Sequence, residues 1–133
     1  MPQWQLLGGD EGLTSGDSYT GARRLVITVT DPDGAALDLS ASTLTFMVKV
    51  RLSDDDIDAL ITKVSTDVAE IEIASPQTGA TKGKAYLTLE EDDTYTLAGR
   101  YVWELEADDA AGKLTLAKGA VYIASDLIEG AAS

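Results

Sequence analysis

The chain of 133 residues contains no cysteine and no histidine. Without cysteine there is no disulfide framework, no thiol nucleophile and no zinc–thiolate site. Without histidine, the commonest general base and the commonest metal ligand are both missing. Serine–histidine and cysteine–histidine hydrolases are therefore excluded, and only a pair of carboxylates could supply acid–base catalysis. We expect a protein that is not an enzyme and that uses no cofactor and no metal.

Basic residues are also scarce. Ten Lys and Arg stand against 23 Asp and Glu, which gives a formal net charge of −13. Binding to phosphates requires a basic patch, and the only basic pair in the sequence is Arg23-Arg24. A nucleic-acid partner is therefore not expected. The acidic surplus is typical of a solvated surface that keeps a protein soluble.

Long apolar runs are missing as well. No stretch reaches the roughly 18 apolar residues that a membrane-spanning helix needs, so no membrane association is expected. The first residues, 1–4, have neither the basic region nor the apolar core of a signal peptide. We expect a protein that is made in a host cytoplasm and assembled there into something larger.

The most informative segment that is present is 97–105. Gly99 suits a tight turn, because glycine takes a positive φ at no steric cost. After it, Tyr101, Trp103 and Leu105 alternate with polar or smaller residues, as in a half-buried strand. This strand holds one of the two tryptophans of the chain. We predict that it lies at the centre of the core.

Similar alternation predicts further strands. In the segment 43–51, Leu44, Phe46, Val48 and Val50 would face inward, and Phe46 should contact Trp103. A bulge is expected in the last strand near its glycine. The other predicted strands are 23–30, 60–65, 68–73, 84–90 and 114–123.

The connecting segments are rich in acidic residues. In 53–58, Ser53 could cap one helical turn, so this segment is either a solvated loop or short helix, or a metal or partner site. The segment 91–94 is predicted to be a turn. The cluster 31–34 superficially resembles a calcium loop, but an EF-hand requires further oxygen ligands that the sequence does not supply at the right spacing.

About seven to nine short strands with closely spaced turns predict an antiparallel, immunoglobulin-like β-sandwich of the all-β class. The run from Leu97 to Trp103 resembles the tyrosine corner of that fold, without its disulfide. The sandwich is expected to span residues 21–125. Residues 126–133 would form a short tail, and residues 1–20 an N-terminal arm or an edge strand.

The arm carries the predicted partner-binding residues Trp4, Leu6 and Leu7. Two interpretations remain open: the arm folds back as an edge strand of the sandwich, or it extends and docks on a neighbouring protein. Apolar side chains on a glycine-rich arm suit docking. No residue elsewhere in the sequence is predicted to be catalytic.

The order of landmarks along the chain adds a resemblance. A strand that ends in an Asp-x-x-Gly turn is followed by an Asp-Leu-Ser step, and next by a strand of the form hydrophobic-x-Phe-x-Val-Lys. A strand before an acidic turn, a Leu-x-Gly-x-Tyr run and a closing hairpin complete the order. The segments are 31–34, 38–40, 44–49, 84–93, 97–101 and 103–123. This order resembles the N-terminal domain of phage baseplate upper proteins and related phage immunoglobulin-like domains.

The resemblance implies a structural component of a bacteriophage virion, in the tail or baseplate, that acts as an adaptor between subunits. It implies other virion proteins as partners, and copies of the chain could also associate in the particle. Members of that group often carry a long C-terminal extension, whereas this chain ends at Ser133, so we expect a domain that stands alone. The alternatives are a capsid decoration protein that binds the major capsid protein and a carbohydrate-binding module that contacts the host surface.

Overall fold

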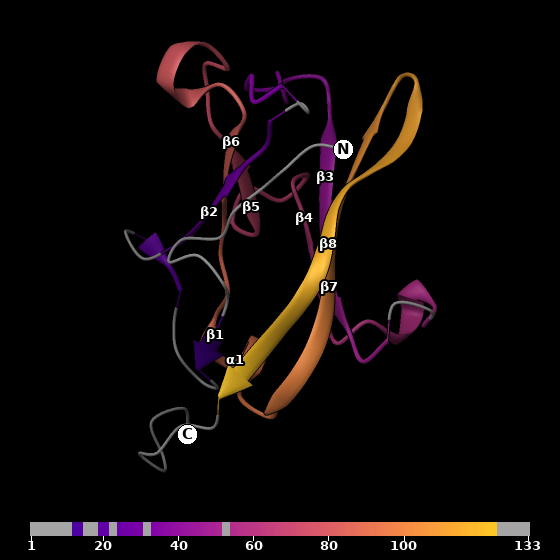
Figure 1. Ribbon diagram of the computed structural model, residues 1–133. Helices are drawn as coiled ribbons and strands as arrows, with labels where there is room; N and C mark the ends of the chain where they lie inside the picture. Colours follow the sequence, from indigo (N-terminus) through magenta and orange to yellow (C-terminus); the bar gives the residue numbers. More distant parts are fainter. Residues whose placement is uncertain (1–11, 15–18, 22–23, 31–32, 52–53, 125–133) are drawn as a thin grey trace.

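The computed structural model describes residues 12–14, 19–21, 24–30, 33–51 and 54–124. Two sheets pack face to face in this part of the chain (Figure 1). The larger sheet has the order β1-β8-β7-β3-β4 and the smaller has the order β2-β6-β5. The strands are β1 (Gly12–Thr14), β2 (Leu25–Thr28), β3 (Thr43–Lys49), β4 (Ile61–Val64), β5 (Ile71–Ile73), β6 (Lys84–Leu87), β7 (Gly99–Asp109) and β8 (Gly112–Ala124).

This topology is that of an immunoglobulin-like sandwich. Strand β7 lies between its hairpin partner β8 and the distant strand β3, so the chain crosses between the sheets as it does in Greek-key sandwiches. The predicted all-β class is therefore confirmed, with eight strands in the described residues. One pairing differs from the expected antiparallel pattern, because β1 runs parallel to β8.

The core lies between the sheets and consists almost entirely of aliphatic side chains. Leu105 is fully buried, and Phe46 stacks on Trp103 with ring centroids 6.5 Å apart, as predicted. Trp103 also spans a cross-strand neighbour, because a Cβ added to Gly119 would lie 2.9 Å from the indole ring. The glycine at position 119 therefore makes room for the largest side chain of the core.

The predicted tyrosine corner is present. The hydroxyl of Tyr101 donates to the carbonyl oxygen of Ala98 at 3.1 Å, and the N–H of Ala98 approaches the same hydroxyl at 3.2 Å. Gly99 between them has φ +116°, which only glycine adopts without strain. These bonds fix the angle at which the chain enters β7 and thus the direction of Trp103.

Several local predictions were wrong. Strand β3 ends at Lys49, so Val50 is 51% exposed instead of buried. The bulge in the β7–β8 hairpin lies at Leu116 and not near Gly119, because the register changes where Leu105 and Glu106 pair with residues 117 and 115. Strand β5 begins only at Ile71, after a turn that contains Val68. The expected turn at 91–94 is a four-residue helix, α1 (Glu91–Thr94).

Two short 3₁₀ helices complete the described elements, η2 (Asp56–Asp58) and η3 (Gly79–Thr81). Neither these nor α1, which together are the helices of the described residues, is long enough or apolar enough to cross a membrane.

Candidate interaction surface

The predicted partner-binding residues Trp4, Leu6 and Leu7 lie outside the residues that the structure describes. The described chain begins with β1, which extends the larger sheet by pairing Gly12 with Tyr122 and Thr14 with Ala124. An edge strand therefore exists directly after the arm. The choice between docking and folding back remains open for residues 1–11.

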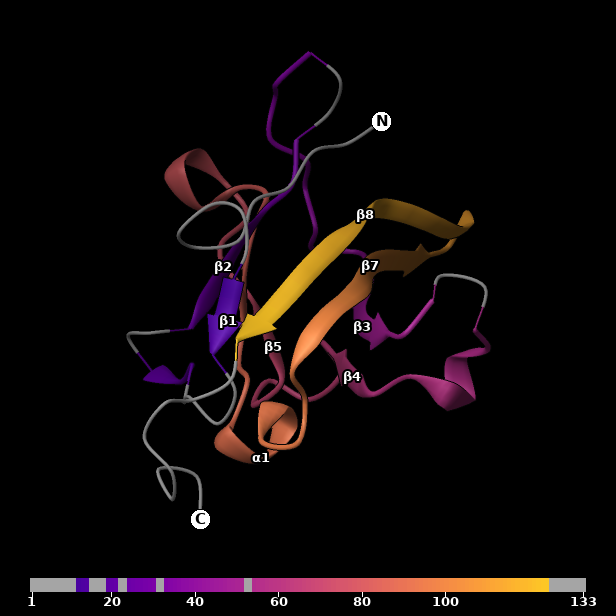
Figure 2. The same cartoon turned by 60° about the horizontal axis from the view of Figure 1, so that its bottom comes forward.

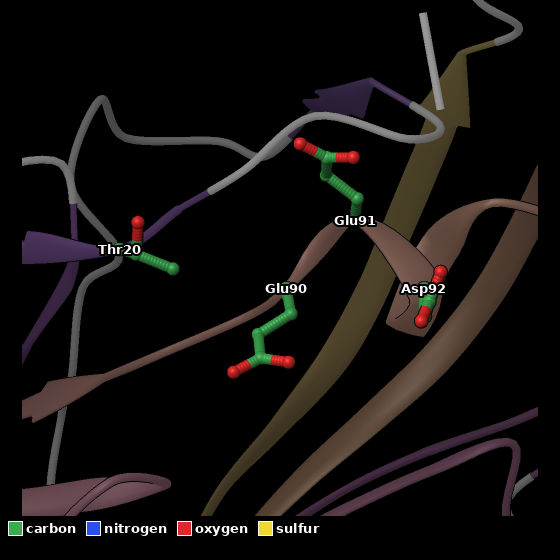
Figure 3. Close-up of a pocket in the computed structure, with 4 residues that line it drawn as sticks. All are labelled: Thr20, Glu90, Glu91 and Asp92. Carbon is green, nitrogen blue, oxygen red and sulfur yellow. The ribbon is translucent and has the colours of Figure 1, made fainter. Parts of the chain in front are cut away.

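One shallow hollow of about 310 Å³ lies beside α1 and is lined by Thr20, Glu90, Glu91 and Asp92. Figure 3 shows that Glu90 and Glu91 point to opposite sides of the chain and that Asp92 lies apart on α1. In the part of the chain that the structure describes, no three acidic side chains gather to hold a metal ion. The hollow offers no pair of converging carboxylates for general acid–base chemistry.

The basic pair of the sequence does not form a free patch either. Arg23 lies outside the described residues, and Arg24 is engaged on the outer face of the smaller sheet. Its guanidinium forms an ion pair with Glu72 at 2.6 Å and lies 4.7 Å from the ring centre of Tyr86. This side chain therefore ties β2 to β5 across β6.

The outer edge of β4 is protected against pairing with another chain. The N–H of Val64 donates to the Glu70 carboxylate at 2.9 Å instead of facing solvent. Lys63, which pairs with the core residue Phe46, is only 12% exposed in its side chain and reaches Asp93 on α1 at 2.8 Å. An inward charged residue and a capped edge are both devices that oppose edge-to-edge association.

The larger sheet also has an outer face that turns away from the core. At one margin of this face, residues 54–60 connect β3 to β4 and are called the Ile57 loop here (Figure 2; magenta). Lys49 anchors the loop: its Nζ donates to Asp56 Oδ1 at 2.8 Å, to Glu104 Oε1 at 3.2 Å and to the carbonyl oxygen of Asp54 at 3.2 Å. The lysine is 3% exposed and thus spends its charge on holding the loop against the sheet.

The rigid loop presents an apolar residue to solvent. Ile57 on η2 is 90% exposed, and Leu60 at the end of the loop is 42% exposed. Asp55 and Asp58, next to Ile57, are exposed and form no ion pair with a described residue. An ordered isoleucine between free carboxylates is an unusual arrangement for a surface that serves only solvation.

The opposite margin of the same face has complementary chemistry. We call Arg100, Lys118, Ala120 and Tyr122 the Tyr122 strip. Register places Arg100 opposite Tyr122 and Lys118 opposite Glu104 on β7 and β8. Tyr122 is 58% exposed, and the other three residues of the strip are exposed as well. Neither basic residue of the strip forms an ion pair within the described chain.

The ion pair under the loop has a defined effect on titration. The hydrogen bond from Lys49 holds the pKa of Asp56 below its ordinary value of 3.8, and the bond from Asp56 is the main cause that raises the pKa of Lys49 above 10.5. The pair therefore contributes stability between these two values. For Asp56 the contribution is lost as the pH falls through its lowered pKa, and for Lys49 it is lost as the pH rises through its raised pKa.

We predict that replacing Lys49 by Met returns the pKa of Asp56 to its ordinary range, because the hydrogen-bonding cation is removed. An NMR titration of the Asp56 carboxyl carbon measures this pKa in both proteins. Glu91 is exposed and makes no ion pair with a described residue, so its titration should not change in the variant. An unchanged pKa of Asp56 would show that Lys49 does not hold the loop in solution.

Comparisons with known proteins add little about function. No family model matches the chain, and no curated protein matches it. Two solved structures are similar in fold. CopC from Methylosinus trichosporium OB3b is 9% identical with a TM-score of 0.42, over 95% of this chain and 98% of that chain. AggA, the major subunit of aggregative adherence fimbriae type I from Escherichia coli, is 10% identical with a TM-score of 0.33, over 95% of both chains. Neither similarity supports an inference about activity or partners.

Proposed function

We propose that the chain is a non-enzymatic structural protein of a bacteriophage virion, a tail or baseplate adaptor that mediates contacts between subunits. The observation that carries the proposal is how the described polar groups are used. The buried Lys49 and Gln77 hold loops in place, and the acidic residues at the one sizeable hollow diverge. Such a chain is built to present a fixed shape to other proteins.

The landmarks of the phage-like order also have structural roles that suit this proposal. The Asp38-Leu39-Ser40 step is a turn in which Asp38 Oδ1 accepts the N–H of Ser40 at 2.9 Å, while Leu39 is buried. The segment 44–49 forms most of β3, and 97–101 forms the tyrosine corner. Each landmark thus fixes a loop or a core strand, which is the kind of residue that a scaffold requires.

The partners in this proposal are other virion proteins, and the contact is made by Trp4, Leu6 and Leu7 of the arm. A tryptophan anchor suits this role, because buried aromatic residues dominate interface energies. Carbohydrate binding on the host surface is a weaker candidate, since Trp103 is used in the core. Binding to a glycan array that is lost in Tyr122→Ala would favour that alternative.

Location in the particle tests the function directly. Antibodies against the chain, used for gold labelling of gradient-purified phage particles, should mark the tail or baseplate. Label over the head would favour a capsid decoration protein as the correct alternative. Particles without the chain, released from cells that express it, would contradict a role in the virion.

We predict that deleting residues 1–11 leaves the domain folded and abolishes its incorporation into particles. The deletion stops before Gly12 and therefore preserves the pairing of β1 with β8. Thermal unfolding of the purified variant measures folding, and immunoblotting of purified particles measures incorporation. The control replaces Trp4, Leu6 and Leu7 by Ser at full length and should behave in the same way. Normal incorporation of both variants would rule out the arm, and failure of the truncated chain to fold would assign its apolar residues to the core.

A further inference from the structure

The outer face of the larger sheet carries two complementary margins. The Ile57 loop brings an exposed apolar side chain flanked by free carboxylates, and the Tyr122 strip brings an exposed aromatic ring flanked by free cations. The basic side is notable because the chain has only ten Lys and Arg in all. We propose that this face binds the same face of a second copy of the chain, with the Ile57 loop of each copy on the Tyr122 strip of the other.

The register fixes how the two margins are placed. Lys49, Val102 and Ala120 are consecutive partners across β3, β7 and β8 and therefore form one row across the sheet. The alternating buried residues Val48, Trp103 and Val121 of the same strands face the core, so this row faces outward. Lys49 holds the Ile57 loop at one end of the row, and Ala120 belongs to the Tyr122 strip at the other end.

The loop also stands on the outer side of the sheet. Asp56 lines a small depression together with Thr45, Met47, Glu104 and Glu106, which are outward residues of β3 and β7. In both Figure 1 and Figure 2 the loop projects on the side of the larger sheet that lies away from β2 and β5. An apolar knob and its complement therefore border one common face.

This placement favours a twofold-symmetric contact. A rotation of one copy by half a turn about an axis through the centre of the face exchanges its two margins. The loop of each copy then meets the strip of the other, which is the self-complementary arrangement of an isologous dimer. Asp55 and Asp58 would meet Arg100 and Lys118, and Ile57 would cover the ring of Tyr122.

The net charge of −13 opposes association of two copies at long range. Salt at about 0.15 M reduces this repulsion, because its screening length is about 8 Å, whereas ion pairs in direct contact are weakened less. Pairing of opposite charges at both margins then selects one orientation out of many. The inference goes beyond the proposed function and does not depend on it, because it concerns the purified chain alone.

Sedimentation equilibrium of the purified full chain tests the contact, from micromolar concentrations up to about 1 mM. The weight-average mass of the wild-type protein should rise from that of a monomer toward that of a dimer. Ile57→Ser should weaken the dimer by an order of magnitude or more, since it removes the central apolar contact. The matched control is Val68→Ser, which changes an apolar residue of 65% exposure on another loop and should leave association unchanged.

Charge reversal provides the decisive comparison. The loop variant Asp55→Lys/Asp58→Lys and the strip variant Arg100→Glu/Lys118→Glu should each remain monomeric. A mixture of the two should form a heterodimer, because one margin then pairs the original charges and the other pairs the reversed charges. A wild-type chain that stays monomeric throughout, an equal effect of Ile57→Ser and Val68→Ser, or a mixture that does not associate would each overturn the proposal.

Discussion

Gln77→Ala is expected to lower the free energy of unfolding by about 4 kcal/mol, the largest effect predicted for a single polar residue of this chain. The Gln77 side chain is buried in the loop between β5 and β6. Its Oε1 accepts the N–H groups of Leu39 at 3.0 Å and Gly83 at 2.9 Å, and its Nε2 donates to the carbonyl oxygen of Ala74 at 2.7 Å. Alanine would leave both N–H groups buried without this acceptor.

The cost follows from desolvation, because a buried donor that loses its acceptor costs about 1–3 kcal/mol. Chemical denaturation of both proteins measures the difference. The control is Thr78→Ala, an exposed neighbour in the same loop, which should change stability by less than about 0.5 kcal/mol. Equal effects of the two substitutions would mean that Gln77 does not carry the junction between the β2–β3 and β5–β6 connections.

Trp103→Ala is expected to cost about 3 kcal/mol, at the low end of the range for a large core aromatic, because the indole is only partly buried. The substitution removes the stacking on Phe46 and opens a void over Gly119. It also removes the donor to the carbonyl oxygen of Ala120, which the indole Nε1 approaches at 3.2 Å. Denaturant unfolding measures the loss.

Two controls separate these contributions. Trp103→Phe keeps an apolar ring against Phe46 and should cost less than the alanine variant. Tyr122→Ala removes an exposed aromatic side chain of the same sheet and should cost less than about 1 kcal/mol. A loss in Trp103→Ala as small as that in Tyr122→Ala would show that the indole does not belong to the core.

The fold could be predicted from the sequence because its strands alternate strictly. Leu44, Phe46 and Val48 follow the period of two, and so do Trp103 and Leu105, so both central strands and their contact were recognisable. Strand ends were less predictable. The alternation continues to Val50, but the chain leaves the sheet at Lys49 to begin the Ile57 loop, a change that depends on distant partners.

The polar interior could not be predicted for the same reason. Gln77 belongs to a polar loop in the sequence, and its partner Leu39 is 38 residues away. Lys49 was assigned correctly to the outer face of β3, but its burial depends on a loop that folds back over it. Ile57 lies within an acidic run that predicts solvation. Its 90% exposure on an anchored loop is visible only in the structure.

The parallel pairing of β1 with β8 determines how the domain would respond to mechanical tension. The chain enters the described sandwich at Gly12 and leaves it at Ala124, and these two strands lie side by side with the same direction. A pull on the two ends would slide the strands past each other, so the hydrogen bonds that cross between them would be loaded together in shear. Strands of a hairpin that are pulled from one end open one bond at a time. The first barrier to stretching therefore lies at the β1–β8 pair, ahead of any loss of the core.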